Sequence, residues 1–370
     1  MLSCWTLIPT VVSADTTRLS VPPRRTPAGS RTPVTLQTVA DRVGVSTMTV
    51  SNVIHGRGKV GAETRARVKE AVRVTGYVPN MAARRLAGVA GTRLGLLYPD
   101  VRSPFLTEVL LAALASANAV GAQLVVREGR AATLEHAEQL VVEAIEGGAE
   151  GLLLVPPYAE LLAGSETFLR LGIPSTAIAG AAPLHGMQTL RIDNRGAADQ
   201  LTSHLLQAGH HRIAFITGPM DHGDSQQRLL GFQDAMHRAA LPIDPASVRA
   251  GRFCFQSGCE AAEALLAASS RPTAIVASND DMALGVLWVA QRAGLRLPDD
   301  LSVVAFDDTA ASRRAWPPLT VIAQPMASMT DAAVAALINT LSGKAELPSG
   351  EWVLPYELLV RTSSAPPSRR

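Results

Sequence analysis

Short apolar runs alternate with amphipathic stretches along most of the chain, from residue 93 to about residue 320. The apolar runs predicted to be strands are 94–98, 123–126, 151–155, 175–178, 190–192, 213–217, 273–277 and 302–306. The stretches between them whose apolar positions recur at helical spacing include 105–120, 134–146, 197–208, 225–239, 258–268 and 281–293. Such alternation predicts parallel sheets that are covered by helices on both faces.

This alternation falls into two halves, at about residues 93–190 and 191–320. Pro325 opens a further long helix that runs to Leu341, and 352–360 is predicted to be a closing strand. We therefore expect an α/β core over residues 91–365, with two doubly wound parallel-sheet subdomains that residues 321–362 complete. Because open parallel sheets bind ligands beyond the carboxyl ends of their strands, two facing subdomains would form a cleft that closes by a hinge.

A different pattern precedes the core, where residues 34–78 form a small domain with predicted helices at 36–43, 47–54 and 62–75. Thr35 is a suitable N-cap for the first helix. Gly44 can take the left-handed conformation that ends this helix, and Ser46 can cap the second. The second helix is expected to bury Val50, Val53 and Ile54 and to turn Thr47, Met48, Ser51 and Asn52 outward. This spacing is typical of a DNA-binding helix-turn-helix, whose second helix enters the major groove.

The distribution of charge favours DNA binding over the alternative of a small helical bundle without a ligand. Residues 34–90 carry nine Lys and Arg against three Asp and Glu, a net charge of +6. Residues 1–33 have a net charge of +3, and the remaining 280 residues one of −7. A basic module ahead of an acidic body is typical of a head that binds a polyanion.

Two segments flank the small helical domain at residues 34–78. Residues 1–33 are rich in Pro, Thr, Ser and Arg and lack periodicity, so we expect a disordered N-terminal extension. A signal peptide is disfavoured because the apolar stretch is short, is interrupted by Pro9 and has no basic segment before it. Residues 79–90 predict a hinge helix that Asn80 caps and Gly88 ends. This helix is too short to persist alone, so it requires a partner.

The composition excludes several classes of protein. No apolar run approaches the roughly 18–20 residues of a membrane span. Three cysteines, Cys4, Cys254 and Cys259, are too few for a disulfide framework or a thiolate zinc site, so a cytoplasmic location is expected. His210, His211 and His222 lack further ligands at metal spacing, so no metal site is predicted.

Residues 34–88 resemble the headpiece of the lactose/galactose repressor family of bacterial transcription regulators. The matching motifs are Thr-Leu-x-x-Val-Ala (35–40), Gly-Val-Ser (44–46), Thr-Val-Ser (49–51), Gly-Tyr-x-Pro-Asn (76–80) and Arg-Leu-Ala-Gly (85–88). The resemblance implies that phosphates are held by Thr35, Ser46, Thr49 and Ser51, and that bases are read by Thr47, Met48 and Asn52. Asn52 stands where many members carry Arg. In the hinge, the implied DNA contacts are Asn80, Arg84, Arg85 and Leu86, and Leu86 is the residue that wedges into the minor groove.

The core resembles the periplasmic-binding-protein-type sensor of the same family. The motifs are Asp-Asn-x-Gly-Ala (193–197), Gly-His-x-Arg-Ile-Ala (209–214), Gly-Pro (218–219), Arg-Leu-x-Gly-Phe (228–232), Asn-Asp-x-Met-Ala-Leu-Gly (279–285), Ser-Val-Val-x-Phe-Asp-Asp (302–308) and Pro-Leu-Thr (318–320). The effector contacts that the resemblance implies are Phe105, Asp193, Arg228, Asn279 and Asp307, with Phe253 as the stacking aromatic. Carboxylates, an amide and a guanidinium suit the hydroxyls of a sugar or sugar derivative. Ala179 falls where some sugar-binding members carry Asp.

The sequence thus predicts a repressor-type transcription regulator that binds double-stranded operator DNA as a homodimer under the control of a small effector, without a membrane partner. The tail from residue 363 has no leucine heptad for a tetramerising coiled coil. One alternative is a solute-binding protein for carbohydrate uptake, and another is an α/β enzyme. Both leave the basic head unexplained, and no catalytic residue is predicted because Asp307 and Asp308 are adjacent at a strand end and point apart. No cofactor is predicted, because no glycine-rich nucleotide motif opens a helix after a strand.

Overall fold

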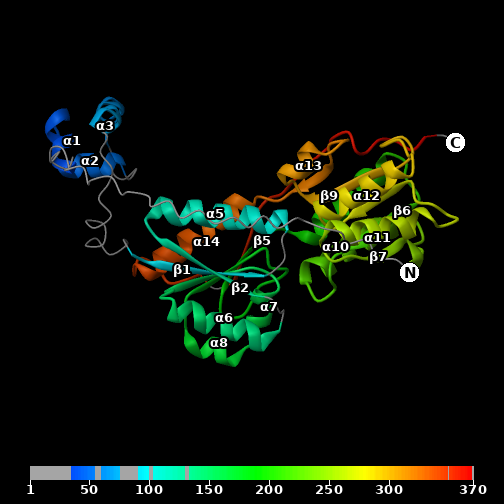
Figure 1. Ribbon diagram of the computed structural model, residues 1–370, viewed down its shortest axis with the longest axis horizontal. Coiled ribbons are helices and arrows are strands. Elements are labelled where there is room, and N and C mark those ends of the chain that lie inside the picture. Colours follow the sequence, from blue (N-terminus) through cyan, green and yellow to red (C-terminus); the bar gives the residue numbers. More distant parts are fainter. Residues whose placement is uncertain are drawn as a thin grey trace, which may run out of the picture. The chain divides into compact units, whose positions relative to one another are not determined.

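The computed structural model describes residues 35–54, 60–75, 91–99, 103–129, 133–348 and 350–368. The chain divides into two compact units, Met1–Asn80 and Met81–Arg370 (Figure 1). The predicted N-terminal extension at 1–33 and the predicted hinge helix at 79–90 lie outside the described residues. Among the described residues, no helix combines the length and the apolar character that a membrane crossing requires.

The described part of the first unit consists of α1 (Leu36–Val43), α2 (Thr47–Ile54) and α3 (Ala62–Thr75), with the predicted bounds. Thr35 caps α1 in a capping box with Thr38, and Gly44 ends α1 at φ 72°. The three helices enclose a small apolar core of Val39, Ala40, Val43, Val50, Val53, Val68 and Ala71. The turn between α1 and α2 is therefore fixed both by its caps and by burial on either side.

The first sheet of the second unit has the strand order β11-β5-β4-β3-β1-β2, and all its pairs are parallel. Its strands are β1 (Arg93–Pro99), β2 (Gln123–Gly129), β3 (Gly151–Leu154), β4 (Ser175–Ile178), β5 (Gln188–Arg191) and β11 (Gly350–Val353). One face, with Leu94 and Leu96 of β1, packs against α5 (Pro104–Val120) and α14 (Met326–Leu341). The other face, with Leu97, packs against α6 (Leu134–Glu146), α7 (Tyr158–Ala163) and α8 (Glu166–Leu171). Side chains that alternate along a strand thus serve two separate apolar cores.

The second sheet repeats this plan with the order β12-β10-β9-β8-β6-β7, in which only the β10–β12 pair is antiparallel. Its strands are β6 (Ile213–Thr217), β7 (Val248–Ala250), β8 (Ala274–Ala277), β9 (Ser302–Asp307), β10 (Thr320–Ala323) and β12 (Glu357–Leu359). One face packs against α11 (Phe255–Leu266) and α12 (Asp280–Arg292), and the other against α9 (Asn194–Gln207) and α10 (Gly223–Arg238). The short 3-10 helix η1 (Pro245–Ser247) and helix α13 (Ala310–Arg314) lie in connections.

The predicted closing strand at 352–360 is wrong as one element. The structure has β11 and β12 there, and each belongs to a different sheet. Pro355 lies between them, and a proline without an N–H group cannot continue a strand ladder. The chain therefore crosses between the two sheets three times, after β5, after β10 and after β11. Strands β7 and β10 and the short helices α7, α8 and α13 were not predicted.

Candidate ligand cavity and nucleic-acid interface

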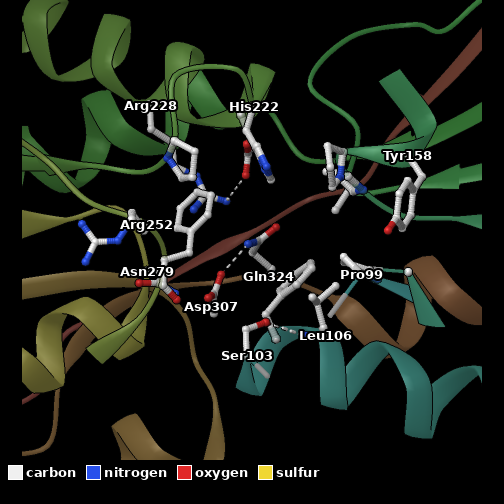
Figure 2. A pocket seen from close by; sticks show the side chains of 18 residues that line it. Pro99, Ser103, Leu106, Tyr158, His222, Arg228, Arg252, Asn279, Asp307 and Gln324 are labelled. Atoms are coloured by element: carbon white, nitrogen blue, oxygen red, sulfur yellow. Dashed lines mark hydrogen bonds and ion pairs between the residues drawn. The ribbon is translucent and has the colours of Figure 1, made fainter. Parts of the chain in front are cut away.

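The second unit contains a cavity of about 200 Å³ where the carboxyl ends of strands from both sheets face each other (Figure 2). The residues that line it are Pro99, Ser103, Phe105, Leu106, Gly129, Pro156, Pro157, Tyr158, Ala179, Pro219, His222, Asp224, Arg228, Arg252, Phe253, Asn279, Asp307 and Gln324. Most of them directly follow a strand or begin the next helix. This is the position in which open parallel sheets bind ligands.

The wall formed by the first sheet and its helices is largely apolar. It presents Pro99, Phe105, Leu106 and the buried ring of Tyr158. Ser103 caps α5 by accepting a hydrogen bond from the backbone N–H of Leu106 at 3.1 Å. This cap fixes the first turn of α5, which carries Phe105 and Leu106 into the cavity. The wall can therefore cover the apolar face of a ligand.

The opposite wall is polar, and Arg228 of α10 is its central cation. Its guanidinium is buried, donates to Asn194 Oδ1 at 2.8 Å and to the carbonyl oxygen of Ser278, and lies 3.6 Å from Asp224 Oδ2. The ring of Phe306 lies beneath the guanidinium carbon, 4.4 Å from ring centre to carbon. These contacts hold the side chain in one orientation, so its charge is preorganised for a ligand.

Asp307, at the end of β9, is the central acid of the same wall. Gln324 Nε2 donates to Asp307 Oδ1 at 2.7 Å. Burial raises the pKa of the Asp307 carboxyl, although the charge of Arg228 and the bond from Gln324 oppose this rise. Burial and the charge of Asp307 also raise the pKa of Asp280, whose Oδ2 accepts from the backbone N–H and the hydroxyl of Thr309 at 2.7 and 2.9 Å. The two acids therefore titrate as a buried pair.

Asn279 and Phe253 are fixed to each other at the edge of the cavity. Asn279 caps α12, with Oδ1 accepting from the backbone N–H of Met282 at 3.0 Å, while its Nδ2 donates to the carbonyl oxygen of Phe253 at 3.0 Å. The backbone of Phe253 has φ 55°, and that of Asp307 has φ 112°. Residues other than glycine rarely adopt such backbone angles, and strained backbone of this kind concentrates at functional sites.

The structure thus brings Phe105, Arg228, Phe253, Asn279 and Asp307 together around one cavity, with Ala179 among the lining residues. Asp193 is not among them. It caps α9 by accepting from the backbone N–H of Gly196 at 3.0 Å, and it lines a separate surface hollow with Arg195 and Asp234. Sequence reasoning did not single out Ser103, Pro157, Tyr158, Asp224, Arg252 or Gln324 as ligand contacts. Pro157 and Tyr158 follow a predicted strand, and Ser103 and Asp224 lie at the start of a helix. Arg252 and Gln324 follow β7 and β10, which were not predicted, so no such signal marked them.

In the first unit, α2 exposes the side chains that the sequence assigns to DNA. Met48 is 68% exposed, and Thr47, Thr49, Ser51 and Asn52 are partly exposed. Ser46 Oγ accepts from the backbone N–H of Thr49 at 3.1 Å and lies 2.9 Å from Thr49 Oγ1. Arg67 of α3 donates to the carbonyl oxygen of Val43 at 2.6 Å, which ties α3 to the turn. Asn80, Arg84, Arg85 and Leu86 lie outside the described residues.

The fold and the two surfaces define a class of protein with a helix-turn-helix head and a two-subdomain ligand-binding core. Residues 35–80 match the family described as bacterial regulatory proteins, lacI family, and residues 202–364 match the periplasmic binding protein-like domain. The HTH-type transcriptional repressor CytR of Escherichia coli (strain K12) is 32% identical over 335 residues, which cover 90% of this chain and 97% of that protein. The chain belongs to the lacI family of bacterial regulatory proteins.

Other relatives agree over nearly the full length of the chain. The HTH-type transcriptional regulator DegA of Bacillus subtilis (strain 168) is 31% identical, with 90% of this chain and 98% of that protein covered. The structure of the transcriptional regulator CelR–cellobiose complex has a TM-score of 0.65 and 31% identity, and covers 89% of this chain and 99% of that one. The lac repressor dimer bound to operator and the anti-inducer ONPF has a TM-score of 0.67 and 28% identity, and covers 90% and 100%.

Proposed function

We propose that the protein is a sequence-specific DNA-binding transcription regulator, acting as a repressor, whose operator binding is controlled by a small effector in the core cavity. The observation that carries this proposal is the presence in one chain of a polar, exposed α2 face and of a cavity with one apolar and one polar wall. The relatives that match nearly the whole chain are transcription regulators. The protein acts by binding, in the cytoplasm where its DNA lies.

Two protomers bind one near-palindromic operator, because a single recognition helix of two turns contacts only one half-site. Thr47, Met48 and Asn52 read base edges, while Thr35, Ser46, Thr49 and Ser51 hold phosphates. The solved dimer of the lac repressor on its operator supports this arrangement. The hinge residues Asn80, Arg84, Arg85 and Leu86 add minor-groove contacts, with Leu86 as the wedge.

The effector is a sugar or sugar derivative. Arg228, Asn279 and Asp307 offer donors and acceptors for neighbouring hydroxyls, and Phe105 and Phe253 cover apolar ring faces. Asp193 caps α9 and lies outside the cavity lining, so we do not include it among the direct effector contacts. The relative solved with cellobiose supports a carbohydrate ligand for this type of cavity.

Effector binding closes the two subdomains of the core, and closure changes the spacing of the paired hinge helices on the operator. The change in operator affinity is limited by the difference between the effector's affinities for the open and the closed cleft.

Selection of binding sites from random duplex DNA with the purified full-length chain tests the proposal. We expect a near-palindromic consensus, binding that weakens steeply with salt, and a change in affinity with at least one sugar of a panel. Failure to enrich any sequence at low salt would contradict the proposal. Enrichment without a response to any sugar would limit it to the DNA-binding part.

A further inference from the structure

Glu160 is a buried acid that the proposed effector contacts do not use. It lies on α7, on the side of the first sheet. Both of its carboxylate oxygens are buried, and neither has a hydrogen-bond partner within the described part of the chain. The backbone N–H groups of Glu160 and Ala181 favour the ionised carboxylate, but neither meets hydrogen-bond geometry. A buried carboxylate without such a partner is costly, so this position calls for a compensating feature.

The two subdomains approach each other closely near this acid. A Cβ atom added to Gly223, in the first turn of α10, would lie 2.4 Å from Cβ of Ala181, which follows β4. The first sheet's loop and the second sheet's helix thus touch at a position that only glycine permits. The next residue of α10, Asp224, is the charged neighbour of Glu160 from the opposite subdomain.

Asp224 has partners of its own on α10. Its Oδ1 accepts from the backbone N–H of Ser225 at 2.8 Å, and its Oδ2 pairs with the buried guanidinium of Arg228. Among the residues that the structure describes, no cation pairs with Glu160. Burial, and secondarily the charge of Asp224, raise the pKa of Glu160 to about 7. Other charged groups lie on the helices that pack against α7, namely Glu135, His136, Glu138, Glu143 and Glu146 on α6, and Glu166 and Arg170 on α8, but none of them contributes to this shift.

We propose that Glu160 is a proton-dependent latch of the cleft: the two subdomains close on it in its neutral form, so that closure takes up a proton. When the subdomains separate, water reaches the carboxylate, Asp224 moves away, and the ionised form becomes favourable. The inference rests on the closing cleft of the proposed function and adds its regulation. An effector that prefers the closed cleft therefore binds more tightly as the pH falls from about 8 to about 6, and one that prefers the open cleft shows the reverse.

The latch is testable without DNA or effector, so its outcome is independent of the proposed regulator function. Spin labels at Val142→Cys on α6 and Leu230→Cys on α10, both exposed positions, report the distance between the subdomains by pulsed electron paramagnetic resonance. Cys4, Cys254 and Cys259 are replaced by Ser in the full-length chain. An excess of unlabelled protein isolates the distance within one protomer.

We expect the longer distance to gain population between pH 6 and pH 8 in the parent protein. Glu160→Gln, which is neutral at every pH, should keep the short distance at both, and Glu160→Met serves the same purpose should Glu160→Gln fail to fold. Glu166→Gln removes a largely exposed acid on α8, which pairs with Arg170, and should behave like the parent. A parent distance that does not change with pH, or one that changes equally in the Glu160 variants, would overturn the latch.

Discussion

The residues of α2 assigned to DNA lie within eight successive positions of one helix, whereas the side chains around the core cavity come from positions as far apart as Pro99 and Gln324. The first surface is exposed and its side chains meet solvent. The second is enclosed, and its polar groups are fixed by partners such as Asn194 for Arg228 and Gln324 for Asp307. Changes on α2 should therefore alter DNA recognition with little cost in stability, while changes in the cavity alter ligand response and stability together.

Arg228→Ala should have the largest effect. It removes a buried cation and leaves Asp224 and Asn194 without their partner, which we expect to cost about 3–5 kcal/mol of unfolding free energy in the core. Urea denaturation followed by circular dichroism measures this cost. The effector response should disappear, while operator affinity remains wherever the core is folded. Loss of operator affinity by a folded variant would show that DNA binding depends on the cavity as well as on α2.

The pH dependence of stability should be next, since each unit of pKa shift corresponds to about 1.4 kcal/mol. Burial raises the pKa of Asp280 and of Asp307, so the folded core binds protons more tightly than the unfolded chain. Their contribution is present below the ordinary carboxyl pKa and is lost as the pH rises through the raised values. Calorimetry from pH 5 to pH 8 should therefore show a falling Tm for the core. Asp280→Asn keeps an acceptor for Thr309 and should reduce the fall of Tm with pH. An unchanged dependence of Tm on pH would show that Asp280 and Asp307 do not cause it.

Asn52→Ala tests the DNA-binding surface without changing the cavity. An amide pairs bidentately with adenine, so its removal should cost about 1–3 kcal/mol per contact and relax selection at one symmetric base pair. Effector affinity and core stability should stay unchanged. Gln37→Ala, on the exposed side of α1, is the matched control. Identical selected sites for the parent and Asn52→Ala would show that Asn52 does not read a base.

Thr35→Ala should have the smallest effect, because it removes one side of the capping box of α1. We expect a loss of about 1 kcal/mol in the stability of the first unit. Hydrogen exchange of the α1 amides in the full-length chain should quicken accordingly, with exchange in the core unchanged. Equal quickening in both units would contradict their independence.

Local signals explain why the head could be predicted from the sequence almost completely. Thr35, Gly44 and Ser46 fix the ends of α1 and the start of α2, and the bounds of α1, α2 and α3 agree with the structure. In the core, most strands and long helices were predicted to within a few residues, because fully buried runs and amphipathic periods are strong signals. The chain crosses from the first sheet to the second at Pro355 because β11 pairs with β5 and β12 pairs with β10. No local sequence pattern shows these pairings.

The cavity was predictable only in part, for a related reason. The polar residues Arg228, Asn279 and Asp307 stand out at strand ends, whereas Pro157 and Tyr158 look like ordinary core residues until the two subdomains face each other. Asp193 shows the converse case, because the helix cap that it forms directs its carboxylate to Gly196. Glu160 likewise meets the backbone of Ala181, and helix α8 and strand β4 lie between these two residues in the chain.

The separation of the two surfaces is tested most directly by comparing the full-length chain with residues 91–370. Fluorescence anisotropy on a selected operator measures DNA binding, and calorimetry with the sugar that alters this binding measures effector affinity. We expect residues 91–370 to bind no operator and to bind the sugar as the full-length chain does. Operator binding that survives removal of the head, or sugar binding that disappears with it, would show that the two surfaces are not separate.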